Sequence, residues 1–169
     1  YSGYSGLAGG QYFDLTFENK NISKKKITDI QNNKTGKLFS FCCESAAIIK
    51  KQNLKKRKIL KKIGLDIGLL FQITDDLIDF KGDSKIVGKP TKRDKKKGKP
   101  TLVNLLGYNQ TLSFANKLKN NITKKIKNYG IKSKDLLQSV EFILSREFWD
   151  GKKKFIRSNQ IPVGFKKAR

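Results

Sequence analysis

The feature that most constrains this chain is a long helical repeat of apolar residues between positions 54 and 80. The apolar side chains recur at the three- and four-residue spacing of a helix face, and after Gly64 they occupy most sides of the helix. A helix of this kind lies in the middle of a protein rather than on its surface. We therefore predict a central helix, which carries three carboxylates near its end: Asp75, Asp76 and Asp79.

The rest of the sequence predicts an all-α fold, because no stretch sustains the alternation of a β-strand. Further helical spacing is found at about 27–50, 109–128 and 133–148. Residues 19–26 are polar and are predicted to form a loop, whereas the glycine-rich stretch 6–11 fits either a tightly packed helix or a loop. Gly36 interrupts a helical pattern at a cost of about 1 kcal/mol relative to alanine, which indicates close packing or a nearby ligand.

The charge of the chain favours anionic partners. It has 38 Lys and Arg against 14 Asp and Glu, a net charge of +24 over 169 residues. Nucleic acid, an anionic membrane or a phosphorylated substrate would each suit this excess. The cations are nearly all lysine, however, whereas nucleic-acid readers use arginine for bidentate contacts. A coding bias toward lysine explains the charge better, so we expect no nucleic-acid partner.

Cysteine content and hydropathy bear on the location of the protein. The two cysteines, Cys42 and Cys43, are adjacent, and the chain has no His, which argues against a zinc site and against a disulfide-stapled secreted domain. No apolar run reaches the roughly 18 residues that span a bilayer. We expect a cytoplasmic protein with no stable membrane insertion.

The three aspartates predict a magnesium site. Asp75 and Asp79 lie one helical turn apart on one face, and Asp76 lies on its flank. Carboxylates stacked in this way among Leu, Ile and Phe require a counter-charge. Magnesium prefers oxygen ligands and bridges one or two carboxylates to substrate phosphates. An exposed acidic face or a helix-end salt bridge would use the same residues, but the apolar setting favours the metal.

A basic loop follows the aspartates over residues 81–100 and contains Lys89 and Lys99, each followed by proline. A polyphosphate held by metal on one side needs cations on its other side. Taken alone, either lysine is better explained as a solvated surface residue of a lysine-rich chain. Their position directly after the aspartate helix makes them candidate phosphate ligands.

Together these elements resemble the second aspartate-rich region of the trans-isoprenyl diphosphate synthases, the family of farnesyl and geranylgeranyl diphosphate synthases. The family pattern GxxFQxxDDxxD, then GD, GK and a second Lys followed by Thr, occurs in order within residues 68–101. GQYFDL at 10–15 resembles the family motif GQxxDL, and KTGKL at 34–38 resembles KTGxL. The resemblance covers about residues 3–148.

The resemblance implies an isoprenoid synthase-type helical bundle around a central cavity, usually homodimeric. It also implies prenyl chain elongation, in which isopentenyl diphosphate condenses with an allylic diphosphate to give a short-chain product. Magnesium, as three ions with the bound diphosphate, assists ionisation of the allylic substrate. The implied metal ligands are Asp75, Asp76, Asp79 and Asp14. The implied diphosphate-binding residues are Lys34, Lys89 and Lys99, the catalytic residues Lys34, Thr35 and Gln72, and the cavity residues Phe71 and Gln11.

The first aspartate-rich motif of the family and its isopentenyl diphosphate-binding residues do not occur in these 169 residues. We therefore interpret 1–148 as the C-terminal portion of a prenyltransferase helical domain that lacks its N-terminal helices, and leave the basic tail 149–169 unassigned. An alternative is a non-catalytic prenyltransferase-like subunit that regulates a catalytic partner. A class I terpene cyclase fits less well, because its second metal motif is of the Asn-Ser-Glu type.

Overall fold

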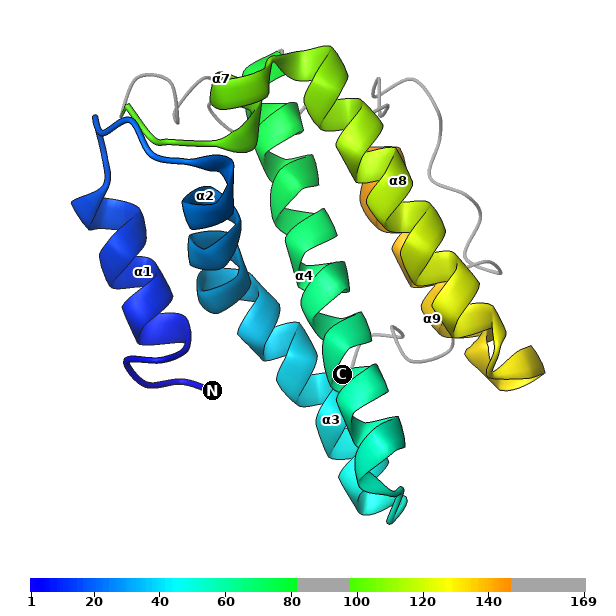
Figure 1. The fold of residues 1–169 in the computed structure, drawn as a ribbon. Coiled ribbons are helices and arrows are strands. Elements are labelled where there is room, and N and C mark those ends of the chain that lie inside the picture. Colours follow the sequence, from blue (N-terminus) through cyan, green and yellow to red (C-terminus); the bar gives the residue numbers. More distant parts are fainter. Residues whose placement is uncertain (82–97, 147–169) are drawn as a thin grey trace, which may run out of the picture.

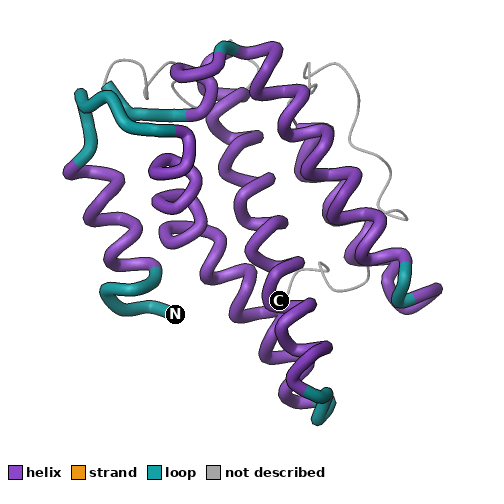
Figure 2. Tube along the Cα trace, in the orientation of Figure 1, coloured by secondary structure: helices purple, strands orange, loops and turns teal. Residues whose placement is uncertain are grey.

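The computed structural model describes residues 1–81 and 98–146, and every regular element within these ranges is a helix (Figures 1 and 2). The α-helices are α1 (Leu7–Thr16), α2 (Lys24–Gln31), α3 (Lys37–Ile49), α4 (Leu54–Lys81), α7 (Leu102–Leu106), α8 (Tyr108–Lys127) and α9 (Lys134–Ser145). Two short helical segments complete the set: η1 (Asn32–Gly36), which is π-helical, and η2 (Gly130–Ser133), which is a 3₁₀-helix. The predicted all-α class is confirmed.

Two hydroxyl caps explain where helices begin. Ser23 Oγ accepts a hydrogen bond from the backbone N–H of Lys26 at 3.2 Å, so α2 begins at Lys24. The prediction of a loop over 19–26 was therefore wrong for its last three residues, because a serine cap can start a helix even where the first turn is all lysine. Thr101 caps α7 in the same way, accepting from the N–H of Asn104 at 3.2 Å.

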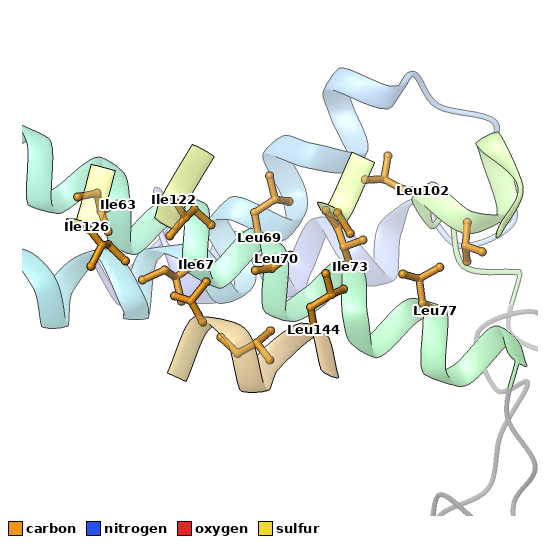
Figure 3. Packing of buried hydrophobic residues seen from close by; sticks show 14 of the residues in the cluster. Ile63, Ile67, Leu69, Leu70, Ile73, Leu77, Leu102, Ile122, Ile126 and Leu144 are labelled. Carbon is orange, nitrogen blue, oxygen red and sulfur yellow. The ribbon is translucent and has the colours of Figure 1, made fainter. Parts of the chain in front are cut away.

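Helix α4 is the central helix, as predicted. In Figure 1 it runs between α8 and the rod that α2, η1 and α3 form together. Its apolar side chains meet those of α7, α8 and α9 in one core, whose packing is drawn in Figure 3. Ile63, Leu70, Ile73 and Leu77 of α4 are each 0% exposed. Burial of each such side chain stabilises the fold by about 1.5–3 kcal/mol. The aspartate helix is therefore held rigidly by its own core face.

The π-helical turn η1 lies between α1 and α4 and is packed closely by both (Figure 1). A Cβ atom on Gly10 of α1 would lie 2.2 Å from the backbone nitrogen of Lys34. A Cβ atom on Gly68 of α4 would lie 2.6 Å from the Cα of Gly36. Only glycine allows these approaches, so the predicted close packing at Gly36 is confirmed and the stretch 6–11 is resolved as part of a tightly packed helix.

Within the described ranges, no helix has both the length and the apolar character that crossing a membrane would require.

Candidate functional site

A polar pocket lies where α1, α2, η1 and α4 meet the segment that leads into α7. The pocket lining is Asp14, Ile27, Ile30, Gln31, Lys34, Gln72, Asp76, Lys99, Pro100 and Thr101. Several residues that the sequence singled out separately, from motifs far apart along the chain, therefore meet in one place. The structure brings residues of the GQxxDL, KTGxL and aspartate-rich motifs together around this one pocket.

One wall of the pocket is an ion cluster. The ammonium of Lys34 donates to Asp14 Oδ2 at 2.6 Å, and the ammonium of Lys99 lies 3.4 Å from the same oxygen. All three side chains are largely buried, with 18–25% of their surface exposed. The carboxylate of Asp14 orients both ammonium groups. This wall is suited to an anion with several oxygens.

A second part of the lining, the amide wall, consists of side-chain amides that hydrogen-bond to Asp76. Asp76 is 3% exposed and accepts hydrogen bonds from Gln31 Nε2 at 2.7 Å and Gln72 Nε2 at 3.0 Å. The hydroxyl of Thr35 donates to Gln72 Oε1 at 3.1 Å. Because each partner is itself held, the carboxylate of Asp76 and the amide of Gln72 have one fixed orientation.

Asp75 lies on a different side of α4 from Asp76. Asp75 accepts a hydrogen bond from a terminal nitrogen of Arg146, at the end of α9, at 3.0 Å. Asp79 lies one turn further on and is half-buried. The helix thus divides the three carboxylates, with Asp76 at the pocket and Asp75 toward α9, since neighbouring helical residues point about 100° apart.

The remaining predicted residues are placed as follows. Phe71 is half-buried on α4, and its ring centroid is 5.7 Å from that of Phe39. Gln11 is exposed on α1 and is not part of the pocket lining. Lys89 and the tail 149–169 lie outside the described residues.

Sequence reasoning missed two residues that contact the aspartates, Gln31 and Arg146. Gln31 is buried beside the apolar positions Ile27 and Ile30 of α2, and a glutamine within an apolar helical pattern was the available signal. Arg146 is one of only five arginines in a lysine-rich chain, which marks it as unusual. The positions of Gln31 and Arg146 in the sequence do not indicate which aspartate each of them contacts.

The donor atoms at the pocket fit magnesium. Gln31 Oε1 is a buried oxygen with no hydrogen-bond partner in the described structure, and the Nε2 of the same amide is bonded to Asp76. Carboxylate and amide oxygens are the ligands that magnesium prefers. Across residues 1–81 and 98–146, no three His, Cys, Asp or Glu side chains form a ready metal group. Among the aspartates predicted as ligands, Asp14 is paired with the ammonium groups of Lys34 and Lys99 and Asp75 with Arg146, whereas Asp76 accepts from two neutral amides.

The all-helical bundle matches the isoprenoid synthase-type helical fold, which is the class of protein that the similar solved structures define. The chain superposes on a geranyltransferase from Helicobacter pylori, complexed with magnesium and isoprenyl diphosphate, with a TM-score of 0.69 and 29% identity, covering 85% of this chain and 47% of that one. An FPP/GFPP synthase from Zymomonas mobilis gives a TM-score of 0.71 and 35% identity, covering 84% and 46%.

The polyprenyl synthetase family model matches residues 3–140, and the chain belongs to this family. A dimethylallyltranstransferase from Fischerella ambigua is 33% identical over 145 residues, which are 85% of this chain and 42% of the relative. A farnesyl diphosphate synthase from Micrococcus luteus is 35% identical over 115 residues, covering 68% of this chain and 40% of the relative. The chain thus spans less than half the length of these two relatives.

Proposed function

We propose that this chain forms part of a prenyl-elongating transferase, which condenses isopentenyl diphosphate with an allylic diphosphate. The product is a short-chain prenyl diphosphate such as farnesyl or geranylgeranyl diphosphate. The observation that carries this proposal is the pocket itself, in which Asp14, Lys34 and Lys99 face Asp76 and its amide partners.

The wall of the pocket formed by Asp14, Lys34 and Lys99 is the proposed binding site of the allylic diphosphate. Lys89 is proposed as a further diphosphate ligand, by resemblance. When the bond between the allylic carbon and the diphosphate oxygen breaks, the electron pair leaves with the diphosphate and the carbon becomes cationic. The ammonium groups of Lys34 and Lys99 then stabilise the negative charge that grows on the leaving oxygens. Such groups are effective because Asp14 has already oriented them and no reorganisation is needed at the moment of reaction.

The amide wall is the proposed support of the reacting carbons. Gln72 presents a fixed amide to the site, held from behind by the hydroxyl of Thr35, and Ile27 and Ile30 make part of the lining apolar. The double bond of isopentenyl diphosphate attacks the allylic cation, a new carbon–carbon bond forms, and the resulting cation loses a proton to the released diphosphate. The apolar part of the lining restricts water, which would otherwise capture the cation.

Magnesium is the proposed cofactor, held by Asp75, Asp76, Asp79 and Asp14, with three ions accompanying the diphosphate. When bound, it supplies positive charge that the leaving diphosphate requires. The fitting observation is the oxygen-rich wall that contains Asp76 and the unpartnered Gln31 Oε1.

The proposed protein is a homodimer located in the cytoplasm. Helix α3 leaves apolar side chains exposed to solvent, with Leu38 at 50%, Phe41 at 48% and Ile49 at 75% exposure. Exposed apolar patches are typical of protein–protein interfaces, and the exposed apolar side chains of α3 support an association.

The test is a turnover assay on the full-length protein, with labelled isopentenyl diphosphate, each allylic primer in turn, and magnesium or EDTA. We expect magnesium-dependent formation of a longer prenyl diphosphate. Lys34→Gln and Lys99→Gln should each lower kcat/KM by about 100-fold, as loss of one charge-stabilising donor does elsewhere. Lys50→Gln is the matched control, because Lys50 is exposed at the end of α3, outside the pocket lining.

Equal turnover in the pocket variants and in the Lys50→Gln control would refute the site assignment, as would full activity of an Asp75→Ala/Asp79→Ala double variant. A folded full-length protein that makes no product would instead favour the alternative function, a prenyltransferase-like subunit that regulates a catalytic partner. Co-purification with a catalytic subunit would then identify that role.

A further inference from the structure

Arg146 makes contacts that the proposed chemistry does not use. It caps the C-terminus of α9, and one terminal guanidinium nitrogen donates to Asp75 Oδ1 at 3.0 Å. The guanidinium carbon lies 4.4 Å from the ring centroid of Phe71, and its Nε donates to the backbone carbonyl of Ile143 at 3.3 Å. A carboxylate, an aromatic face and its own helix therefore fix one cation over the aspartate-bearing side of α4.

The contact with Arg146 engages an oxygen of a proposed metal ligand. Asp75 is one of the proposed magnesium ligands, and its carboxylate oxygen is already bonded to a cation. The side chains of Arg146 and Asp75 are only 25% and 29% exposed, so their attraction is less screened than that of a surface pair. A second cation at Asp75 must therefore compete with the guanidinium or repel it.

We propose that Arg146 is a positioning residue that acts as the counter-cation of Asp75 in the metal-free protein and is displaced when magnesium diphosphate binds. This inference rests on the proposed function, since it concerns the same aspartates. Displacement breaks a contact between residues 71 positions apart, which joins the end of α9 to the C-terminal part of α4. Loading of the site is thereby coupled to the position of the end of α9.

The proposal predicts the direction in which the affinity for magnesium pyrophosphate changes when Arg146 is replaced, and this affinity can be measured without turnover. Arg146→Gln removes the competing charge but keeps a polar side chain, so magnesium pyrophosphate should bind about 3- to 5-fold more tightly. This range corresponds to a partly exposed ion pair worth up to about 1 kcal/mol. Arg146→Lys keeps the charge but loses the planar fork and the stacking on Phe71, and its affinity should fall between the two.

The experiment is calorimetric titration of the full-length protein with magnesium pyrophosphate, for wild type, Arg146→Gln, Arg146→Lys, Asp75→Asn and the Asp75→Asn/Arg146→Gln double variant. The proposal requires that Arg146→Gln tighten binding in the wild-type background and have no effect once Asp75 is Asn. A purely structural role for Arg146 would not produce this dependence on Asp75. Circular dichroism checks that each variant is folded, and Arg146→Lys provides the test if Arg146→Gln is not.

Weaker or unchanged binding by Arg146→Gln would overturn the inference and leave the proposed function standing. Absence of magnesium pyrophosphate binding in the wild type would overturn the proposed function, and this inference with it.

Discussion

Adding one methyl group at Gly68 should separate α4 from the π-helical turn η1, the two elements that contribute Gln72, Asp76 and Lys34 to the pocket. In Gly68→Ala the new Cβ would lie 2.6 Å from the Cα and 3.1 Å from the backbone nitrogen of Gly36. Both atoms belong to backbone, so no side chain can turn away to make room. The helices must move apart by several tenths of an ångström or more.

The size of the effect follows from two opposing terms. Alanine in place of glycine inside a helix gains about 1 kcal/mol. Overpacking a well-filled contact costs about 1–3 kcal/mol, and the upper part of that range applies where the neighbour is backbone. We therefore expect Gly68→Ala to lower the free energy of unfolding by about 1–2 kcal/mol. For a domain of this size that is a fall in Tm of about 2–8 °C.

The assay is thermal unfolding followed by circular dichroism, supported by urea titration. Gly3→Ala is the control, because a Cβ at Gly3 would meet no atom within 4 Å, and its Tm should match the wild type. If Gly68→Ala melts at the wild-type temperature or above it, helix propensity outweighs the contact. The reasoning from the close approach to Gly36 would then be refuted.

Three further predictions concern charge, burial and the thiols. Asp66 of α4 is 6% exposed and accepts hydrogen bonds from lysines of α4 and α8. Asp66→Asn should therefore lower the urea midpoint by an amount equivalent to about 1 kcal/mol. An unchanged midpoint would show that the two lysine contacts contribute nothing to the free energy of unfolding. Thr111→Val removes the hydroxyl that donates to the buried carbonyl of Leu102 at 3.1 Å, and should cost about 1–3 kcal/mol in the same titration, a prediction that a neutral result would contradict. Burial, followed by the charge of Cys42, raises the pKa of the Cys43 thiol, so a smaller fraction of Cys43 is thiolate at pH 8. Iodoacetamide should therefore label the exposed Cys42 first, and the difference between the two labelling rates should narrow as the pH rises. Mass spectrometry of timed samples measures the order of labelling, and labelling of Cys43 first would contradict the prediction.

The sequence could predict the central helix and the place of the aspartates on it. Helical spacing fixes the direction of each side chain relative to its neighbours, and the apolar side chains of 54–80 indicated which residues of α4 pack in the core. The predicted range 54–80 agrees with the observed Leu54–Lys81. Motif resemblance then brought Asp14, Lys34 and Lys99 into the same proposal, and the structure places them in one pocket.

The contacts between distant helices could not be predicted. Gln31 is 45 positions from Asp76, and no local rule states that an amide at the end of α2 should meet that carboxylate. The pairing of Arg146 with Asp75 spans 71 positions and depends on how α9 packs against α4. Glycine signals at Gly36 indicated close packing, but the change from α- to π-helical backbone depends on neighbours that the local sequence does not reveal.

The π-helical turn Asn32–Gly36 also has a consequence for how this segment can change by descent. A π turn holds one more residue per hydrogen-bonded ring than an α turn, so losing one residue would let the rod run as a continuous α-helix. Because the wide π turn absorbs the extra residue, the deletion would leave the helices on either side in nearly the same rotation but would remove the backbone turn on which Lys34 meets Asp14. A single-codon deletion here should therefore be tolerated less well than most single substitutions, and the length of this segment is as much a part of the site as its lysine.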